Sequence, residues 1–158
     1  MISHLNKKNK PTIVDISSKK ITNRMAIAQG IVEFSKSTYK KIESLKTKKG
    51  EIKSIAIIAG ILGAKKTSDL IPLCHNIEIE NIDIDIETIR KISSLKVTAI
   101  VKSRGKTGVE MEALSGVSIA CLTIYDMCKS LDKNIVIKDI RLVKKIGGKS
   151  DFSKLKKK

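Results

Sequence analysis

Alternation of apolar with other residues, the two-residue period of a β-strand, marks several stretches of the chain. The first covers residues 22–34 and the last covers residues 135–144. Between them, residues 77–87 alternate Ile with Glu or Asp, and the phase slips at Asn81. This pattern predicts a strand with one buried and one acidic face, and a bulge at the slip. We expect residues 95–102 to form its antiparallel partner.

Apolar residues at helical spacing predict the helices. Ser37 is placed to cap a short helix over residues 38–45. A second helix is predicted over residues 51–64, where Ala and Gly residues allow another backbone to approach closely, and a long third helix over residues 109–131. The predicted inward residues are Ile52, Ile55, Ala56, Ala59 and Leu62 on the second helix, and Ala113, Val117, Ala120 and Ile124 on the third.

The predicted order is strand, helix, helix, strand, strand, helix, strand. Counting the first two helices as one unit gives βαββαβ, an α+β ferredoxin-like sandwich with an antiparallel sheet. Such a sheet leaves one face uncovered, and an Ile-rich uncovered face favours subunit contacts, so we expect an oligomer. The 158 residues suit one domain. We expect a flexible N-terminus over residues 1–12, a single domain over 13–150 and a basic flexible tail over 151–158.

Composition excludes several classes of protein. No apolar run approaches the roughly 18 residues of a membrane span, and the first residues contain no signal-peptide core. The 3 Cys residues cannot form a closed disulfide framework, which favours a reducing cytoplasm. The net charge of +16 attracts polyanions without specificity, but the excess of Lys and Ile is also typical of A/T-rich codon usage.

A basic RNA-binding module on the same fold is the main rival class. Such a module stacks bases on aromatic side chains of its sheet. Residues 77–87 and 95–102 contain no aromatic residue, and the first of these strands is acidic. We therefore expect nucleic-acid binding to be weak and steeply salt-dependent, with no specific nucleic-acid partner and no membrane partner.

Candidate chemistry begins where the long helix starts. Residues 105–108 (Gly-Lys-Thr-Gly) precede it, and free N–H groups at a helix start favour an anion, although Ile100 breaks the nucleotide-binding P-loop pattern. Glu110 and Glu112 then point about 200° apart around the helix, so one of them must face the protein or a neighbouring subunit. A capping Glu followed by an exposed Glu is an equally good interpretation of the spacing alone.

Asp126 and Lys129 lie three residues apart near the end of the same helix. A surface ion pair, worth roughly 0.3–0.5 kcal/mol, is one interpretation. The apolar segment 120–125 before the pair favours another, an acid–base pair with shifted proton affinities.

Cys74 and His75 follow the rigid apolar residues 70–73. Adjacent Cys and His residues suit neither zinc ligation nor a Cys–His nucleophile, but His75 could bind an anion or act as a base. Lys49 and Lys145 also lie near glycines, and several lysines with a histidine and a few acids suit a substrate that carries a polyphosphate.

Longer motifs resemble a known family. Residues 70–75 (Leu-Ile-Pro-Leu-Cys-His), 105–114 (Gly-Lys-Thr-Gly-Val-Glu-Met-Glu-Ala-Leu) and 122–129 (Leu-Thr-Ile-Tyr-Asp-Met-Cys-Lys) are similar to signatures of the cyclic pyranopterin monophosphate synthases, the molybdenum cofactor biosynthesis proteins C, or MoaC family. The resemblance covers about residues 12–151. Small departures are Asn76 in place of a usual Pro, Ile57 in place of a common Arg, and Asp151 in place of the Gly that usually follows Gly-Gly-Lys-Ser.

The resemblance implies a ferredoxin-like subunit in a homohexamer, a trimer of dimers, with active sites at subunit interfaces. It implies a cytoplasmic lyase that converts 3′,8-cyclo-7,8-dihydroguanosine 5′-triphosphate to cyclic pyranopterin monophosphate and pyrophosphate, after an upstream radical SAM GTP cyclase. No resident cofactor or metal is implied, although Mg²⁺ could accompany the substrate triphosphate.

Carried over residue by residue, the resemblance implies that Asp126, Lys129 and Lys49 are catalytic. We hypothesise that Lys129 acts as acid or base and that Asp126 sets its proton affinity. The substrate-binding residues implied by the same motifs are Leu73, Cys74, His75, Glu110, Met111, Glu112 and Lys145.

Overall fold

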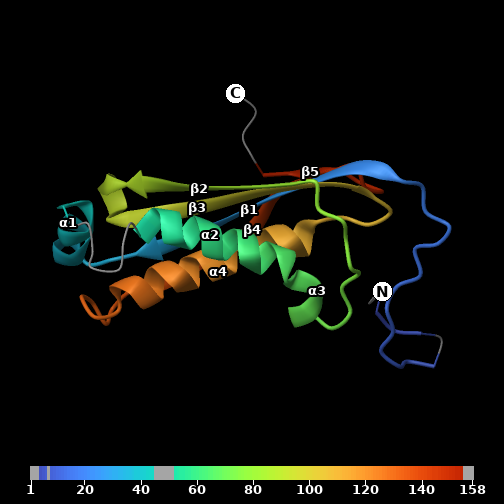
Figure 1. Ribbon diagram of the computed structural model, residues 1–158, viewed down its shortest axis with the longest axis horizontal. Helices are drawn as coiled ribbons and strands as arrows, with labels where there is room; N and C mark the ends of the chain where they lie inside the picture. The colour runs from blue at the N-terminus through green and yellow to red at the C-terminus, as the bar shows by residue number, and fades with distance from the viewer. Residues whose placement is uncertain (1–3, 7, 45–51, 155–158) are drawn as a thin grey trace.

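The computed structural model describes residues 4–6, 8–44 and 52–154, and it is organised as two layers (Figure 1). One layer is a five-stranded antiparallel sheet in the order β2-β3-β1-β4-β5, and helices α2 and α4 cover one face of it (Figure 1). The elements are β1 (Thr22–Glu33), α1 (Lys36–Ser44), α2 (Ile52–Lys65), α3 (Thr67–Leu70), β2 (Asn81–Ile89), the 3-10 turn η1 (Arg90–Ile92), β3 (Ser94–Gly105), α4 (Glu110–Cys128), β4 (Val136–Ile146) and β5 (Phe152–Ser153).

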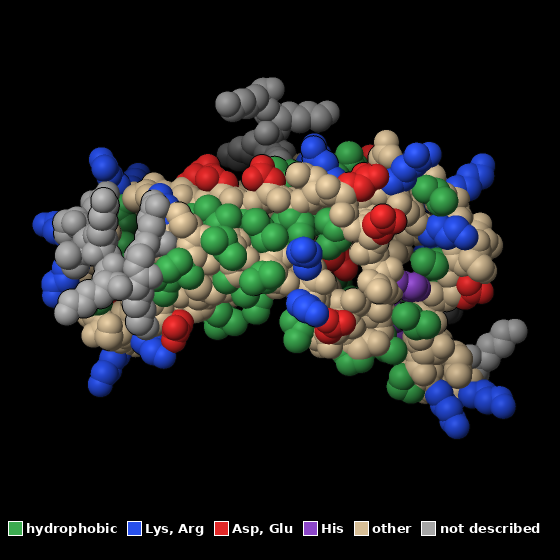
Figure 2. Space-filling view, in the orientation of Figure 1, with side chains coloured by type: hydrophobic (Ala, Val, Ile, Leu, Met, Phe, Trp, Pro, Cys, Tyr) green, Lys and Arg blue, Asp and Glu red, His purple; other side chains and the backbone are tan. Residues whose placement is uncertain are grey.

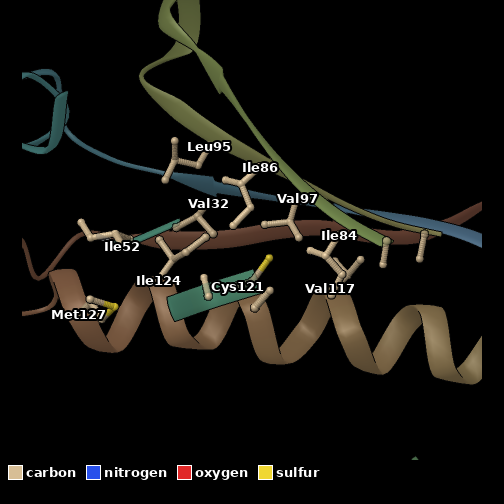
Figure 3. Packing of buried hydrophobic residues seen from close by; sticks show 14 of the residues in the cluster. Val32, Ile52, Ile84, Ile86, Leu95, Val97, Val117, Cys121, Ile124 and Met127 are labelled. Atoms are coloured by element: carbon tan, nitrogen blue, oxygen red, sulfur yellow. The ribbon is translucent and has the colours of Figure 1, made fainter. Parts of the chain in front are cut away.

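The predicted α+β fold and antiparallel sheet are confirmed. In β1, Ala26, Ala28 and Val32 face the helices and are fully buried, as the alternation of the strand predicts. The predicted inward stripe of α4 is also fully buried, and Val117 and Ile124 pack against the sheet in the core (Figure 3). The sequence therefore predicted correctly which side chains of β1 and α4 are buried between the sheet and the helices.

Helices α2 and α4 approach each other through small residues, as the Ala and Gly content of residues 51–64 predicted. Gly60 of α2 lies against Gly116 of α4: a Cβ built on Gly116 would lie 3.3 Å from the Gly60 carbonyl oxygen. A Cβ on Gly60 would lie 2.6 Å from Ile84 Cδ1 and 2.9 Å from the Gly116 carbonyl oxygen. These distances leave no room for a side chain at position 60.

We therefore expect Gly60→Ala to destabilise the fold by about 1–3 kcal/mol, because a helix backbone must move to admit the methyl group. The same change in Gly105→Ala places a methyl group 3.7 Å from Ser103 Oγ, an ordinary contact, and should alter the free energy of unfolding by less than about 0.5 kcal/mol. Urea denaturation of both variants measures the difference. Equal stabilities would contradict the close packing of α2 on α4.

The cap of α1 differs from the prediction. Ser35, not Ser37, is placed as the cap, because its hydroxyl accepts a hydrogen bond from the Thr38 amide at 3.3 Å. Ser35 is itself held in place, since its amide donates to Asp132 at 3.1 Å. Leu45, the predicted end of this helix, lies outside the described residues.

The bulge predicted at Asn81 is wrong. β2 begins at Asn81 and pairs with β3 without a register shift, and residues 77–80 lie outside the strand. The phase slip therefore marks the start of the strand. Isolated hydrogen bonds hold the preceding segment instead. One of them, of 2.7 Å, is donated by Ser103 Oγ to the Glu78 carbonyl.

The inward face of α2 was predicted only in part. Ile52 and Ala56 are buried, but Ile55 and Leu62 are exposed, because the helix turns its glycines rather than its largest side chains towards α4. α4 ends at Cys128, three residues before the predicted end at residue 131. The exposed apolar side chains of α2 and α4 form an apolar surface on the side of these helices that faces solvent (Figure 2).

Near the C-terminus, Phe152–Ser153 form β5, which pairs with Lys144 and Lys145 of β4. The Asp151 carboxylate accepts a hydrogen bond of 3.0 Å from the Gly147 amide, and Gly147 has a positive φ of 84°. Asp151, which stands where the family usually has Gly, thus contributes a hydrogen bond within this turn. The predicted division into termini and a domain over residues 13–150 stays a prediction, and residues 155–158 lie outside the described part of the chain.

One helix among the described residues, α4, is long and apolar enough by length and composition to cross a membrane. Half of its apolar stretch is buried inside the protein. A core helix passes the same test, and the packing of α4 against the sheet and α2 accounts for its apolar character.

Candidate active site

A pocket lies at the N-terminal end of α4, where three distant parts of the chain meet. The segment after α3 contributes Leu73, Cys74 and His75, the start of α4 contributes Glu110, Met111 and Glu112, and the N-terminal segment also reaches the pocket. Its volume is about 180 Å³. The tertiary fold thus brings six of the seven predicted substrate-binding residues to one cavity.

The seventh, Lys145, reaches the same place from β4. Its ammonium lies 3.2 Å from the Glu110 carboxylate, and both side chains are about one-third exposed. Glu110 bends back over the loop before α4, and a Cβ on Gly108 would collide with the Glu110 carboxylate. Glycine at position 108 therefore permits this orientation of Glu110.

Glu112 is the inward-facing acid that the helical spacing left open. It is 3% exposed, and its Oε2 is buried without a hydrogen-bond partner among the described residues. Burial, together with the nearby charge of Glu110, raises the pKa of Glu112 above its usual value. Such a carboxyl group can hold or transfer a proton closer to neutral pH than an exposed one.

His75 and Cys74 lie side by side in the sequence but have different surroundings in the pocket. The Val14 carbonyl accepts a hydrogen bond of 2.7 Å from His75 Nε2, which fixes the proton on that nitrogen. Burial and the charge of Glu112 raise the pKa of the Cys74 thiol, so this residue remains a neutral thiol. Both residues line the pocket, and their predicted role in substrate binding stays a prediction.

A second cavity of about 280 Å³ adjoins the first and shares His75, Ile77 and Thr107 with it. Arg104 and Lys106 also line this second cavity. Glu110 and Glu112 are the acidic residues that line the first cavity, whereas Arg104 and Lys106 line the second together with Glu78.

That loop is held by a residue that the sequence analysis did not single out. Arg24 of β1 donates hydrogen bonds of 3.2 Å to the carbonyls of Gly105 and Lys106. Lys106 in turn donates to the Ser17 carbonyl at 2.7 Å. The predicted anion-binding loop is therefore anchored on β1 and on the N-terminal segment.

Asp126 and Lys129 lie at the opposite end of α4. Their side chains form an ion pair of 2.6 Å and are 60% and 57% exposed. Hydrogen bonding to Asp126 and the charge of that carboxylate raise the pKa of Lys129, which keeps the ammonium protonated. Asp126 follows Glu110 by 16 positions, which corresponds to about 24 Å of helix, so one chain does not bring both groups together.

Of the remaining predicted site residues, Lys49 lies outside the described part of the chain. Among the described residues, no three or more His, Cys, Asp or Glu side chains gather as metal ligands. The expectation that the protein holds no resident metal or cofactor stays a prediction.

The pocket also contains residues that sequence analysis missed, chiefly His4, Ile77, Thr107 and Gly108. Thr107 and Gly108 belong to the motif already noted, so the motif could have indicated them. Nothing in the pattern around His4 separated it from a loose terminus, because its place depends on contacts with residues far along the chain.

Comparison with known proteins adds an independent finding. The MoaC family model matches residues 13–148. Curated proteins named cyclic pyranopterin monophosphate synthase are similar over nearly their whole length: those of Helicobacter hepaticus (51% identity over 152 residues, 96% of each chain) and Lysinibacillus sphaericus (52% over 150 residues, 94% of each chain). The protein of that name from Peptoclostridium acidaminophilum is 48% identical over 148 residues, covering 94% of this chain and 93% of its own.

Proposed function

Because the chain belongs to the MoaC family, we propose that it is a cyclic pyranopterin monophosphate synthase of molybdenum cofactor biosynthesis. It converts 3′,8-cyclo-7,8-dihydroguanosine 5′-triphosphate to cyclic pyranopterin monophosphate and releases pyrophosphate. The reaction is a rearrangement with ring opening, ring closure and formation of a cyclic phosphate, so it is a lyase reaction that needs proton transfers and triphosphate binding.

One observation carries this proposal. The two motif stretches that the resemblance assigns to substrate binding are separated by more than thirty residues along the chain, yet they line the same pocket. Within it, Glu112 offers a buried carboxyl group with a raised pKa and Lys145 neutralises Glu110. This combination suits proton transfer to a bound heterocycle. The cations of the adjoining cavity suit the phosphates.

The distance between the pocket and the Asp126–Lys129 pair supports a site shared between subunits. The pocket and its adjoining cavity contain neither Asp126 nor Lys129, so a site that uses all of these groups cannot be assembled from one chain. The exposed Asp126–Lys129 pair of one copy can complete the pocket of another copy. We propose that the protein assembles as a homohexamer, a trimer of dimers, and that this assembly completes the shared site.

Apolar surface outside the core supports assembly as well. Ile58 and Leu62 of α2 and Leu122 of α4 are 61%, 56% and 54% exposed, and hydrophobic side chains gather over these helices in Figure 2. On the sheet face away from the helices, Ile27 pairs with Ile100 and both are only half-buried. Association would cover these side chains.

We expect sedimentation at micromolar concentration to give an oligomer. Replacing Leu62 and Leu122 by Glu should shift the distribution towards smaller species, because charges resist burial in an apolar contact. Ile92→Glu is a matched control, since this exposed residue lies in the turn η1 between β2 and β3 and not on α2 or α4. A monomer that remains fully active would contradict both the assembly and the shared site.

The remaining parts of the proposal follow from the reaction. The substrate is a cyclised derivative of GTP, so an upstream radical SAM GTP cyclase supplies it. Mg²⁺, where required, arrives bound to the triphosphate as part of the substrate. The place of the reaction is the cytoplasm.

Conversion of the cyclised GTP derivative by the purified protein tests the function. Product is measured as a fluorescent pterin after oxidation, and released pyrophosphate is measured in parallel. Equal amounts of both are expected. Release of pyrophosphate without a pterin would mean simple hydrolysis, and no reaction with a folded oligomer would refute the proposed function.

A further inference from the structure

The N-terminal segment folds back on itself beside the pocket. Its turn is closed by the Asn6 amide, which donates to the Lys10 carbonyl at 2.9 Å, and by a bridge between Leu5 and Pro11. The Thr12 amide donates to the His4 carbonyl at 3.0 Å. Within the described residues this segment therefore has its own backbone hydrogen bonds, and they fix the backbone of His4.

The fixed backbone directs the His4 side chain to the pocket. His4 lines the same cavity as Cys74, Glu110 and Glu112, and its Nδ1 is buried without a hydrogen-bond partner among the described residues. Glu112 Oε2 is the other buried side-chain atom with no partner there. Buried polar atoms are normally paired, so two unpaired polar atoms lining one pocket indicate a ligand that pairs with them.

We propose that His4 contacts the substrate through Nδ1, beside Glu112, and that the N-terminal segment forms one wall of the active site. This inference rests on the proposed function. The contact falls on the guanine-derived ring system, because Arg104 and Lys106, the cations that suit the phosphates, line the adjoining cavity. The N–H groups of such a ring match a carboxylate and an imidazole nitrogen that accept hydrogen bonds.

Two substitutions separate hydrogen bonding from packing. His4→Asn keeps a polar atom near the position of Nδ1, and His4→Leu removes it. We expect His4→Leu to raise KM by about 10-fold or more with a smaller change in kcat, and His4→Asn to stay within about threefold of the parent protein. Lys8→Ala, in the same segment but on its exposed side, should leave KM unchanged. Thermal unfolding of each variant reports on stability.

Equal loss in His4→Leu and His4→Asn, or no change in His4→Leu, would overturn the proposal. A second measurement is independent of turnover. The chain has 2 His residues, so the imidazole NMR signal of His4 is assigned by its loss in His4→Asn. Adding the cyclised GTP derivative to the Lys129→Ala protein should shift that signal. A bound substrate that leaves it unmoved would refute the contact, whereas failure of the parent protein to form product would refute the proposed function.

Discussion

Lys129→Ala should lower turnover by roughly 10²–10⁴-fold while the protein remains folded, because a positioned acid or base contributes about that much to a proton-transfer step. The side chain is more than half exposed, so its removal should leave the free energy of unfolding nearly unchanged. Steady-state turnover and thermal unfolding are measured on the same samples. Near-normal turnover would mean that the pair with Asp126 is only a surface ion pair.

A matched control lies on the same chain. Lys66 and Asp69 form another exposed ion pair at the same spacing, with a distance of 3.1 Å. Lys66→Ala should therefore leave turnover unchanged. Lys129→Arg keeps the positive charge but cannot release a proton near neutral pH, so rescue by Arg would show that Lys129 only binds phosphate.

The pH dependence of the pair has a defined sign. Asp126 raises the pKa of Lys129, so the ammonium persists to higher pH in the parent protein than it would alone. Asp126→Asn removes the charge and should move the basic limb of the rate profile to lower pH if Lys129 acts as the proton donor. An unmoved basic limb would assign that limb to another group.

Mixing two inactive variants should restore activity if the site is shared between subunits. Lys129→Ala removes one half-site and Glu112→Gln removes the other, about 26 Å away along the helix direction in the same chain. Random assembly of equal amounts would give about one quarter of the sites both intact halves, each from a different subunit. The variants are expressed together with different tags, and activity is measured on the doubly tagged oligomers.

The control combines two changes within one half-site. Lys129→Ala with Asp126→Asn should give no activity beyond that of Asp126→Asn alone, because no mixed site then contains both groups intact. Recovery of activity in this control would indicate contamination of the sample by parent protein. Doubly tagged but inactive oligomers of Lys129→Ala with Glu112→Gln would contradict the shared site.

The local periods along the chain determined most of the fold. The alternation in β1 and the stripe on α4 specify buried faces, because a strand and a helix each repeat their side-chain directions with a fixed period. Motif residues also indicated the members of the pocket. Where a local feature was ambiguous the prediction failed: the slip at Asn81 looked like a bulge, but it is the start of β2.

Tertiary structure decided what a period cannot express. The face of α2 that packs is set by the fit of Gly60 against Gly116, so Ile55 remains exposed despite its helical spacing. His4 lines the pocket through contacts between residues far apart in sequence. The sequence analysis assigned Glu112 and Asp126 to the same site. In the structure they lie at opposite ends of α4, because the length of a rigid helix fixes the distance between the residues at its two ends.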